Sequence, residues 1–267
     1  MPAKIKVSQL QDNLRTKNLG RTILFSHEVD STNKQAKELA VGGAHEGTVI
    51  IAETQTMGRG RLGREWISPA GGLWFSLILR PKLSPATASK LTFMAGLAVA
   101  KVLRERFGLE VETKWPNDIL VNGRKICGVI CEMNTTNETI NFVVIGVGVN
   151  GNFNVEKVFP VKLQKAATSI ENELSRKIQL ENLFKALLEK MESIYERSVK
   201  EGFEFILEGW KKYARFLSCE VEVTTLNEKI RGLALDVDHN GALILKLENG
   251  TLKHVLVGDV SLQPELL

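Results

Sequence analysis

The chain of 267 residues contains few cysteines and no long hydrophobic run. Its three cysteines, Cys127, Cys131 and Cys219, are an odd number without a paired framework, which argues against a disulfide scaffold and favours reduced thiols. Cys127 and Cys131 have no histidine or third cysteine nearby, so we expect core residues and not a zinc site.

No apolar run approaches the ~18 residues of a membrane span, and residues 1–6 lack the apolar centre of a signal peptide. We therefore expect a cytoplasmic protein without a membrane contact.

The chain also lacks a strong net charge, internal repeats and low-complexity tracts. Its 35 basic and 31 acidic residues give a net charge of +4, which is too mild to imply a nucleic-acid partner without a clustered basic face. Hydrophobic residues make up 43% and charged residues 25%, as in ordinary globular proteins. The length suits one large domain with a small appendage.

What the sequence does contain is a loop from Gly58 to Trp66 with three glycines and three arginines in nine positions. Glycine lets backbone N–H groups approach an anion closely, and arginine offers a fixed fork of donors for phosphate or carboxylate. The loop therefore predicts a site for a multiply charged, phosphorylated small molecule. The alternative interpretation is an exposed basic turn between two strands.

The same loop formally contains G-x-G-x-x-G, but two familiar phosphate motifs do not fit it. A dinucleotide fingerprint needs a helix beginning within the glycines and an acidic residue roughly 20 positions later. Here the chain runs into residues 66–72, which cannot form a helix, and residues 79–82 read Leu-Arg-Pro-Lys. A P-loop would need Lys-Ser or Lys-Thr where Arg64-Glu65 stands.

Hydrophobic periodicity predicts an alternation of strands and helices. We expect strands at residues 22–25, 49–52, 73–79, 110–114, 125–132 and 140–149. We expect helices that open at Asp30-Ser31-Thr32 and at Ser84-Pro85, and a long helix at 180–199. The runs 125–132 and 140–149 are nearly continuously apolar, which is typical of central strands in a sheet.

The composition changes after about residue 216. Residues 220–224 alternate strictly, and Asn240-Gly241 and Asn249-Gly250 are typical of hairpin turns. We expect a small β unit of ~50 residues packed on the main domain. The predicted organisation is an N-terminal extension over residues 1–20, a main domain over 21–216 and a C-terminal domain over 217–267.

A second cluster of polar residues spans 114–118 and 122–128. Asn122-Gly123 predicts a tight hairpin turn, so two lysines and the carboxylate of Asp118 fall within one hairpin. Lysine suits an anionic oxygen, and Asp118 could bind Mg²⁺ or orient a lysine. The alternative is a hairpin with solvated charges.

A third cluster, Gly146 to Asn150, places two alternate glycines in an apolar strand. Such glycines indicate that another group approaches the backbone closely. Asn150 offers both a donor and an acceptor that could read the edge of a base. A strand bend followed by a turn asparagine would also explain this pattern.

Taken together, these clusters resemble the biotin protein ligases (biotin–[acetyl-CoA-carboxylase] ligases), from about Leu19 to the C-terminus. The residues that carry the resemblance are Asp30 to Asn33, Gln55, Gly58 to Trp66, Lys114 to Asp118, Lys125 to Gly128 and Gly146 to Asn150. The resemblance implies an α+β fold, with a mixed sheet packed with helices as in class II synthetases. It also implies a small C-terminal SH3-like β-barrel.

The resemblance further implies a two-step reaction. Biotin and ATP with Mg²⁺ would give biotinyl-5′-adenylate and pyrophosphate, and the biotinyl group would pass to a lysine of a biotin carboxyl carrier protein. A homodimer is common among such enzymes. The glycine-rich loop would order over the bound intermediate and exclude water.

Residue roles follow from the resemblance by position. Biotin would be bound by Ser31, Thr32, Asn33, Gln55, Arg59, Gly60, Arg61, Lys125 and Gly128. ATP would be bound by Arg59, Arg64, Trp66, Lys114, Asn117 and Asn150. Arg61 and Lys125 would be the catalytic residues, which face the biotin carboxylate and the α-phosphate, and Asp118 would be the ligand of Mg²⁺.

Two alternatives of other classes stay open at this point. A biotin-responsive transcriptional repressor would need a DNA-binding domain of ~60 residues, whereas about twenty residues precede the catalytic pattern, so we expect no DNA partner. A lipoate or octanoate ligase shares the fold and the adenylation step. Its glycine loop has a different pattern, which residues 58–66 do not match.

Overall fold

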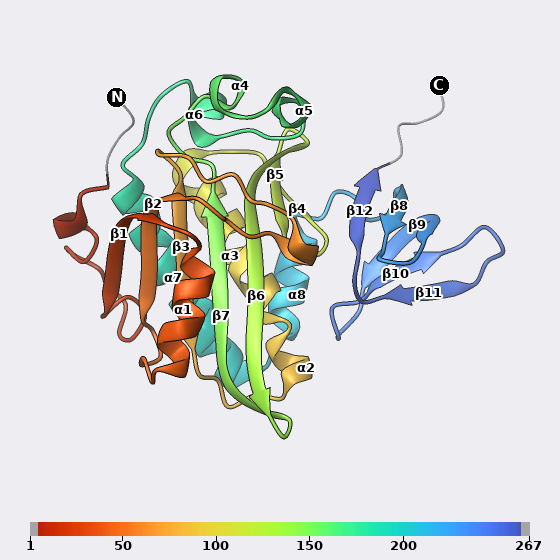
Figure 1. Ribbon diagram of the computed structural model, residues 1–267. Helices are drawn as coiled ribbons and strands as arrows, with labels where there is room; N and C mark the ends of the chain where they lie inside the picture. Colours follow the sequence, from red (N-terminus) through yellow and green to blue (C-terminus); the bar gives the residue numbers. More distant parts are fainter. Residues whose placement is uncertain (1–4, 263–267) are drawn as a thin grey trace.

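The computed structural model describes residues 5–262 and contains a seven-stranded and a five-stranded β-sheet (Figure 1). The larger sheet has the order β1-β2-β3-β7-β6-β5-β4. Its strands are β1 (Ile23–Val29), β2 (Val49–Gln55), β3 (Leu73–Leu79), β4 (Val111–Lys114), β5 (Asp118–Val121), β6 (Arg124–Thr136) and β7 (Thr139–Val149). β1 and β2 are parallel and all other neighbours are antiparallel, so the sheet is mixed. β7 lies at the centre, as its continuous apolar run predicts.

Helices cover both faces of this sheet (Figure 1). The longer helices are α1 (Thr32–Val41), α3 (Leu91–Phe107), α7 (Leu180–Glu201) and α8 (Glu204–Lys211). The short ones are α2 (Pro85–Ala88), α4 (Val155–Val158), α5 (Val161–Gln164), α6 (Ile170–Leu174) and the 3₁₀ turns η1 (Val7–Gln9) and η2 (Arg61–Gly63). α1 packs with Ile50 and Ile78 on one face, whereas α3 and α7 pack with Ile51 and Leu77 on the other. Successive strand residues thus point to opposite layers.

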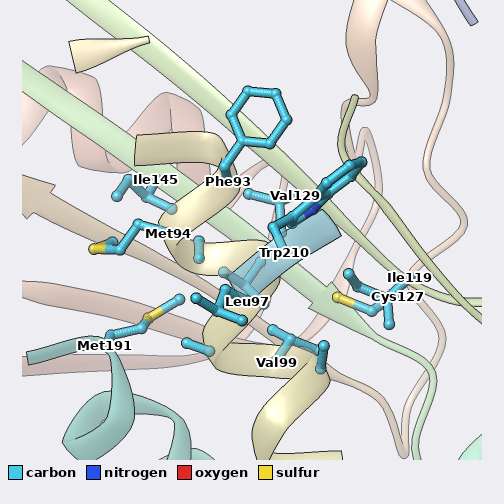
Figure 2. Close-up of a cluster of buried hydrophobic side chains, with 14 of the residues drawn as sticks. Phe93, Met94, Leu97, Val99, Ile119, Cys127, Val129, Ile145, Met191 and Trp210 are labelled. Carbon is cyan, nitrogen blue, oxygen red and sulfur yellow. The ribbon is translucent and has the colours of Figure 1, made fainter. Parts of the chain in front are cut away.

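The main core lies between the sheet and α3. Figure 2 shows Phe93, Leu97 and Trp210 packed together with Ile119, Cys127 and other apolar residues from β6, β7 and α7. The Phe93 and Trp210 rings meet edge to face with centroids 5.1 Å apart. The expectation of core cysteines holds for Cys127, which is fully buried; burial raises the pKa of its thiol and that of Cys131, the latter to about 12.

Two expectations about the region of α3 need correction. The helix predicted from Ser84 is divided, because α2 ends at Ala88 and α3 begins at Leu91. The stretch Pro85–Phe107 is also long and apolar enough by composition to cross a membrane, although no such stretch was expected. However, 67% of its most apolar window is buried inside the protein, as expected for the central helix of a folded domain.

The N-terminal segment from residue 5 to residue 20 packs along α7. Ile5, Leu10 and Leu14 are buried against the main core. The carboxylate of Glu192 on α7 accepts backbone N–H groups of three successive residues, 17 to 19, at 2.6–2.9 Å. A single buried carboxylate therefore fixes the end of this segment.

The C-terminal sheet is antiparallel, with the order β11-β10-β9-β8-β12, and lies beside the main body (Figure 1). Its strands are β8 (Glu220–Thr224), β9 (Lys229–Val237), β10 (Leu243–Lys246), β11 (Leu252–Val255) and β12 (Asp259–Leu262). The hairpins predicted at Asn240-Gly241 and Asn249-Gly250 join β9 to β10 and β10 to β11. The predicted fold class, an α+β domain with a small SH3-like β unit, is confirmed. The exact domain limits at 20/21 and 216/217 stay a prediction.

Candidate active site

The three sequence clusters meet in one pocket on the seven-stranded sheet. Its walls are the start of α1, the end of β2, the glycine-rich loop, the β5–β6 hairpin and the glycines of β7. The predicted site residues that line it are Ser31, Thr32, Asn33, Gln55, Arg59, Gly60, Arg61, Arg64, Trp66, Asn117, Asp118, Lys125 and Gly128. Asn150 and Lys114 are not among its lining residues.

One end of the pocket is lined mainly by polar, uncharged side chains. Ser31 caps α1, since its hydroxyl accepts the backbone N–H of Lys34, and the same side chain lines the pocket. The Thr32 backbone N–H donates to Gln55 Oε1 at 2.8 Å, and Thr32 Oγ1 lies 3.1 Å from the same oxygen. Gln55 Nε2 in turn donates to Ser68 Oγ at 2.7 Å. A neutral group with its own donors and acceptors fits such a surface.

The glycines of β6 and β7 provide room for two large side chains. A Cβ at Gly146 would lie 2.0 Å from Asn33 Oδ1. A Cβ at Gly148 would lie 2.6 Å from Nε1 of Trp66, and a Cβ at Gly128 would lie 3.0 Å from the same ring. The prediction that another group approaches this strand closely is therefore confirmed, and the approaching groups are Asn33 and Trp66.

The glycine-rich loop folds back on itself as an irregular hairpin. Gln55 pairs with Ser68 and Arg59 with Glu65 as isolated antiparallel bridges. The Gly60 backbone N–H donates to the Arg64 carbonyl at 2.7 Å. This closure brings the arginines and Trp66 to the same pocket, so the loop is more than a basic turn between strands.

Arg61 lies where the main domain meets the C-terminal sheet. Its Nη1 donates to Asn117 Oδ1 at 3.3 Å and to the Gly258 carbonyl at 3.1 Å, and it lies 3.5 Å from Asp259 Oδ1. Arg64 pairs with the other oxygen of Asp259. Burial lowers the pKa of the Arg61 guanidinium below its usual value, although Asp259 and Asp118 act in the opposite direction. A partly desolvated guanidinium of this kind favours an anionic ligand.

Lys125 lies at the centre of the charged end. Its Nζ is 2.6 Å from Asp118 Oδ1 and 4.9 Å from the centroid of the Trp66 ring. The expectation that Asp118 orients a lysine is thus met. Among residues 5–262, no group of three or more His, Cys, Asp or Glu side chains could hold a metal ion.

The remaining predicted ATP residues have different surroundings. Asn117 Nδ2 donates to the Val129 carbonyl at 2.7 Å, and Asn117 Oδ1 accepts from Arg61. Asn117 therefore helps to position the arginine side chain. Asn150 lines a neighbouring hollow together with Trp66, Lys125 and Phe159. Its Nδ2 donates to the Thr168 carbonyl at 2.8 Å, and its buried Oδ1 has no partner among the described residues.

Comparison with known proteins identifies the family to which these features belong. Residues 25–150 match the model of the biotin/lipoate A/B protein ligase family, and residues 220–263 match the biotin protein ligase C terminal domain. The bifunctional ligase/repressor BirA of Bacillus subtilis is 36% identical over 262 residues, which cover 98% of this chain and 80% of BirA. The chain belongs to the biotin protein ligase family.

Other biotin protein ligases support the same assignment. The biotin–[acetyl-CoA-carboxylase] ligase of Paracoccus denitrificans is 32% identical over 221 residues, which cover 81% of this chain and 91% of that enzyme. The biotin protein ligase of Aquifex aeolicus, solved in complex with biotin and ATP, is 28% identical and superimposes with a TM-score of 0.77. That match covers 91% of this chain and 99% of the Aquifex chain. The expectation of a ligase of this family is confirmed.

The sequence motifs of this biotin protein ligase missed several residues around the pocket. Ser68 and Ser76 connect the neutral end by hydrogen bonds, and Asp259 reaches the arginines from the C-terminal sheet. The roles of the two serine hydroxyls could not be predicted from the sequence, because isolated serines in strands and loops are common. Asp259 lies almost 200 positions after Arg61, and only the fold brings them together.

Proposed function

We propose that this enzyme attaches biotin to a lysine of a biotin carboxyl carrier protein in two ATP-dependent steps. The observation that carries this proposal is the division of one pocket into a neutral hydrogen-bonding end and a cationic end. Biotin has the matching chemistry, with a neutral ureido ring at one end and a carboxylate at the other. The cytoplasm, where carboxylases work, is the compartment we propose.

In the first step, a carboxylate oxygen of biotin attacks the α-phosphorus of ATP. The bond from that phosphorus to the bridging oxygen breaks, and pyrophosphate leaves with the electron pair. Both reactants are anionic, so the site must neutralise and align them. Lys125 and Arg61 are the cations that we assign to this task, with Arg59 and Arg64 directed to the outer phosphates.

In the second step, a neutral lysine amine of the carrier attacks the biotinyl carbonyl carbon. The carbonyl–oxygen bond to phosphate breaks, AMP leaves, and the amine loses a proton to water or a nearby base. No serine or cysteine nucleophile is needed, because the adenylate is already activated.

We assign the adenine ring to the hollow beside Trp66. Asn150 Oδ1 is buried and has no partner within the described residues, so it can accept from an exocyclic amino group. Trp66, Phe159 and Leu163 offer apolar surface on the same hollow. Trp66 would then cover the bound intermediate from one side.

Magnesium fits this site only as a partner of ATP. Mg²⁺ commonly binds through one or two carboxylates and substrate phosphates, and Asp118 is the carboxylate that faces Lys125. Bound there, it would neutralise phosphate charge. Because Asp118 already pairs with Lys125, its first role in this chain is to hold the lysine.

The test is pyrophosphate release with ATP and Mg²⁺ in the presence of biotin, of lipoate or octanoate, or of no acid. We expect release with biotin alone. Preference for lipoate or octanoate would replace the proposal with the alternative named above, which the description of the family model also includes. The match of residues 220–263 to a biotin ligase C-terminal domain favours biotin.

The repressor alternative has its own test. The BirA relatives are named as ligase/repressors, so DNA binding is measured by a gel-shift titration across salt concentrations. We expect no shift with this chain. The homodimer also stays a prediction, which light scattering with and without biotin and ATP would check.

A further inference from the structure

A chain of hydrogen bonds connects a surface carboxylate to the neutral end of the pocket. Glu132 on β6 is outside the lining, and its side chain is 29% exposed. One carboxylate oxygen accepts from Lys37 Nζ at 2.8 Å, and the other accepts from Asn33 Nδ2 at 2.8 Å. Ser76 Oγ donates to Asn33 Oδ1 at 2.6 Å and lies 2.8 Å from Thr32 Oγ1. The chain ends at Thr32, which lines the pocket.

An ionised Glu132 imposes one direction on this chain. A carboxylate only accepts, so the Asn33 amide must turn its Nδ2 toward Glu132 and its oxygen toward Ser76. A serine hydroxyl has one hydrogen, and Asn33 Oδ1 takes it. The hydrogen of Thr32 goes either to Ser76 Oγ or to Gln55 Oε1, which lies 3.1 Å away, and in both cases the Thr32 oxygen is left as an acceptor toward the pocket.

Three further observations show that this arrangement is fixed. Asn33 and Ser76 are buried, with exposures of 4% and 0%, so neither reorients by exchange with bulk water. Gly146 packs directly against Asn33 Oδ1. Burial alone would raise the pKa of Glu132, but hydrogen bonds from Lys37 and Asn33 lower it below its usual 4.5, which keeps the carboxylate charged at neutral pH.

We propose that Glu132 is a positioning residue that sets the acceptor character of Thr32 and thereby selects an N–H donor of the biotin ureido ring. This inference rests on the proposed function. Glu132 does not touch the substrate. It acts through Asn33 and Ser76 over a path of hydrogen bonds; with the Asn33 amide reversed, the Ser76 hydroxyl would donate to the Thr32 oxygen and occupy it.

The test compares Glu132→Gln with Lys37→Met in the pyrophosphate-release assay. Glutamine has nearly the same shape but can donate as well as accept, so it no longer fixes the Asn33 amide. Lys37→Met removes the ion pair but leaves the carboxylate acceptor in place, and Lys37 is outside the pocket lining. The two variants therefore distinguish the effect of the hydrogen-bond direction from the effect of the ion pair between Lys37 and Glu132.

We expect Glu132→Gln to raise the KM for biotin by about tenfold, the size of one hydrogen bond to a charged or buried group, with kcat and the KM for ATP within about twofold. Lys37→Met should raise the KM for biotin by no more than about threefold, as for a partly exposed ion pair. Assays are run at a temperature well below the thermal unfolding midpoint of each variant, so that partial unfolding is not mistaken for weaker binding.

Two different results would contradict the positioning role of Glu132 and the proposed function, respectively. Equal KM values for biotin in the two variants, or a loss in kcat alone, would overturn the positioning role while wild-type activity with biotin remained. Failure of the wild-type enzyme to release pyrophosphate with biotin would instead overturn the proposed function.

Discussion

Among single residues, the catalytic role assigned to Lys125 gives the most direct prediction. Its Nζ is held by Asp118 and faces the Trp66 ring. We expect Lys125→Ala to reduce biotin-dependent pyrophosphate release by about 10²–10³-fold, because one preorganised charge at a developing anion contributes on that scale. The unfolding midpoint should change little. Near-normal release from this variant would refute its catalytic assignment.

Lys114 is the natural comparison for Lys125. The sequence resemblance assigns it to ATP, but it is not a lining residue of the pocket, although it lies at the end of β4 opposite Asp118. We expect Lys114→Ala to keep the KM for ATP within about threefold, as for a charge without a direct ligand contact. An increase like that of an essential phosphate ligand would restore its predicted role.

At this scale the sequence predicted which residues meet but not how they support one another. Thirteen predicted site residues line one pocket, because each belongs to a motif whose chemistry requires it. Glu132, Ser76 and Asp259 escaped prediction, since their roles depend on contacts between distant segments.

At the scale of elements, Gly148 on β7 leaves room for the Trp66 ring to pack against the sheet. We expect Gly148→Ala to displace the indole, since its Cβ would lie 2.6 Å from Nε1. The KM for ATP should rise by at least about tenfold, which corresponds to ~1.4 kcal/mol. Gly42→Ala is a control, because its Cβ would meet no atom closer than 3.4 Å and its φ is −71°. Equal kinetics in both variants would show that Trp66 does not depend on the glycine.

The N-terminal segment gives a second prediction for an element. Glu192→Gln replaces a carboxylate that accepts three backbone N–H groups with an amide that has one acceptor oxygen. We expect a loss of about 1–3 kcal/mol in the free energy of unfolding by denaturant, from backbone donors left unpaired. Glu196→Gln, which alters only an exposed pair with Lys17, should cost less than about 1 kcal/mol. Equal losses would contradict the anchoring role.

Element types were largely predictable, because apolar periodicity and turn residues are local signals. The central strands, the hairpins at Asn-Gly and the long helix α7 all follow from them. The break between α2 and α3 was not predicted, because Ser89 and Lys90 give no strong stop signal. The anchoring of the N-terminal segment by α7 was also hidden, since it depends on one glutamate far along the chain.

At the scale of the whole molecule, Asp259 joins the C-terminal sheet to the loop over the pocket. We expect Asp259→Asn to release Arg61 and Arg64 from their shared carboxylate. Trypsin should then cut the loop faster in the ligand-free variant, and biotin with ATP should protect both proteins. Asp236→Asn, which disturbs a pair with Lys211, is the control. Unchanged cleavage in Asp259→Asn would argue against a link between the sheet and the loop.

The most direct measurement of the proposed reaction is the intact mass of a biotin carboxyl carrier domain after incubation with the enzyme, biotin and MgATP. We expect a single mass increase equal to one biotinyl group, located on one lysine and absent without ATP. An unchanged carrier mass, with an enzyme that is folded and binds biotin, would contradict it.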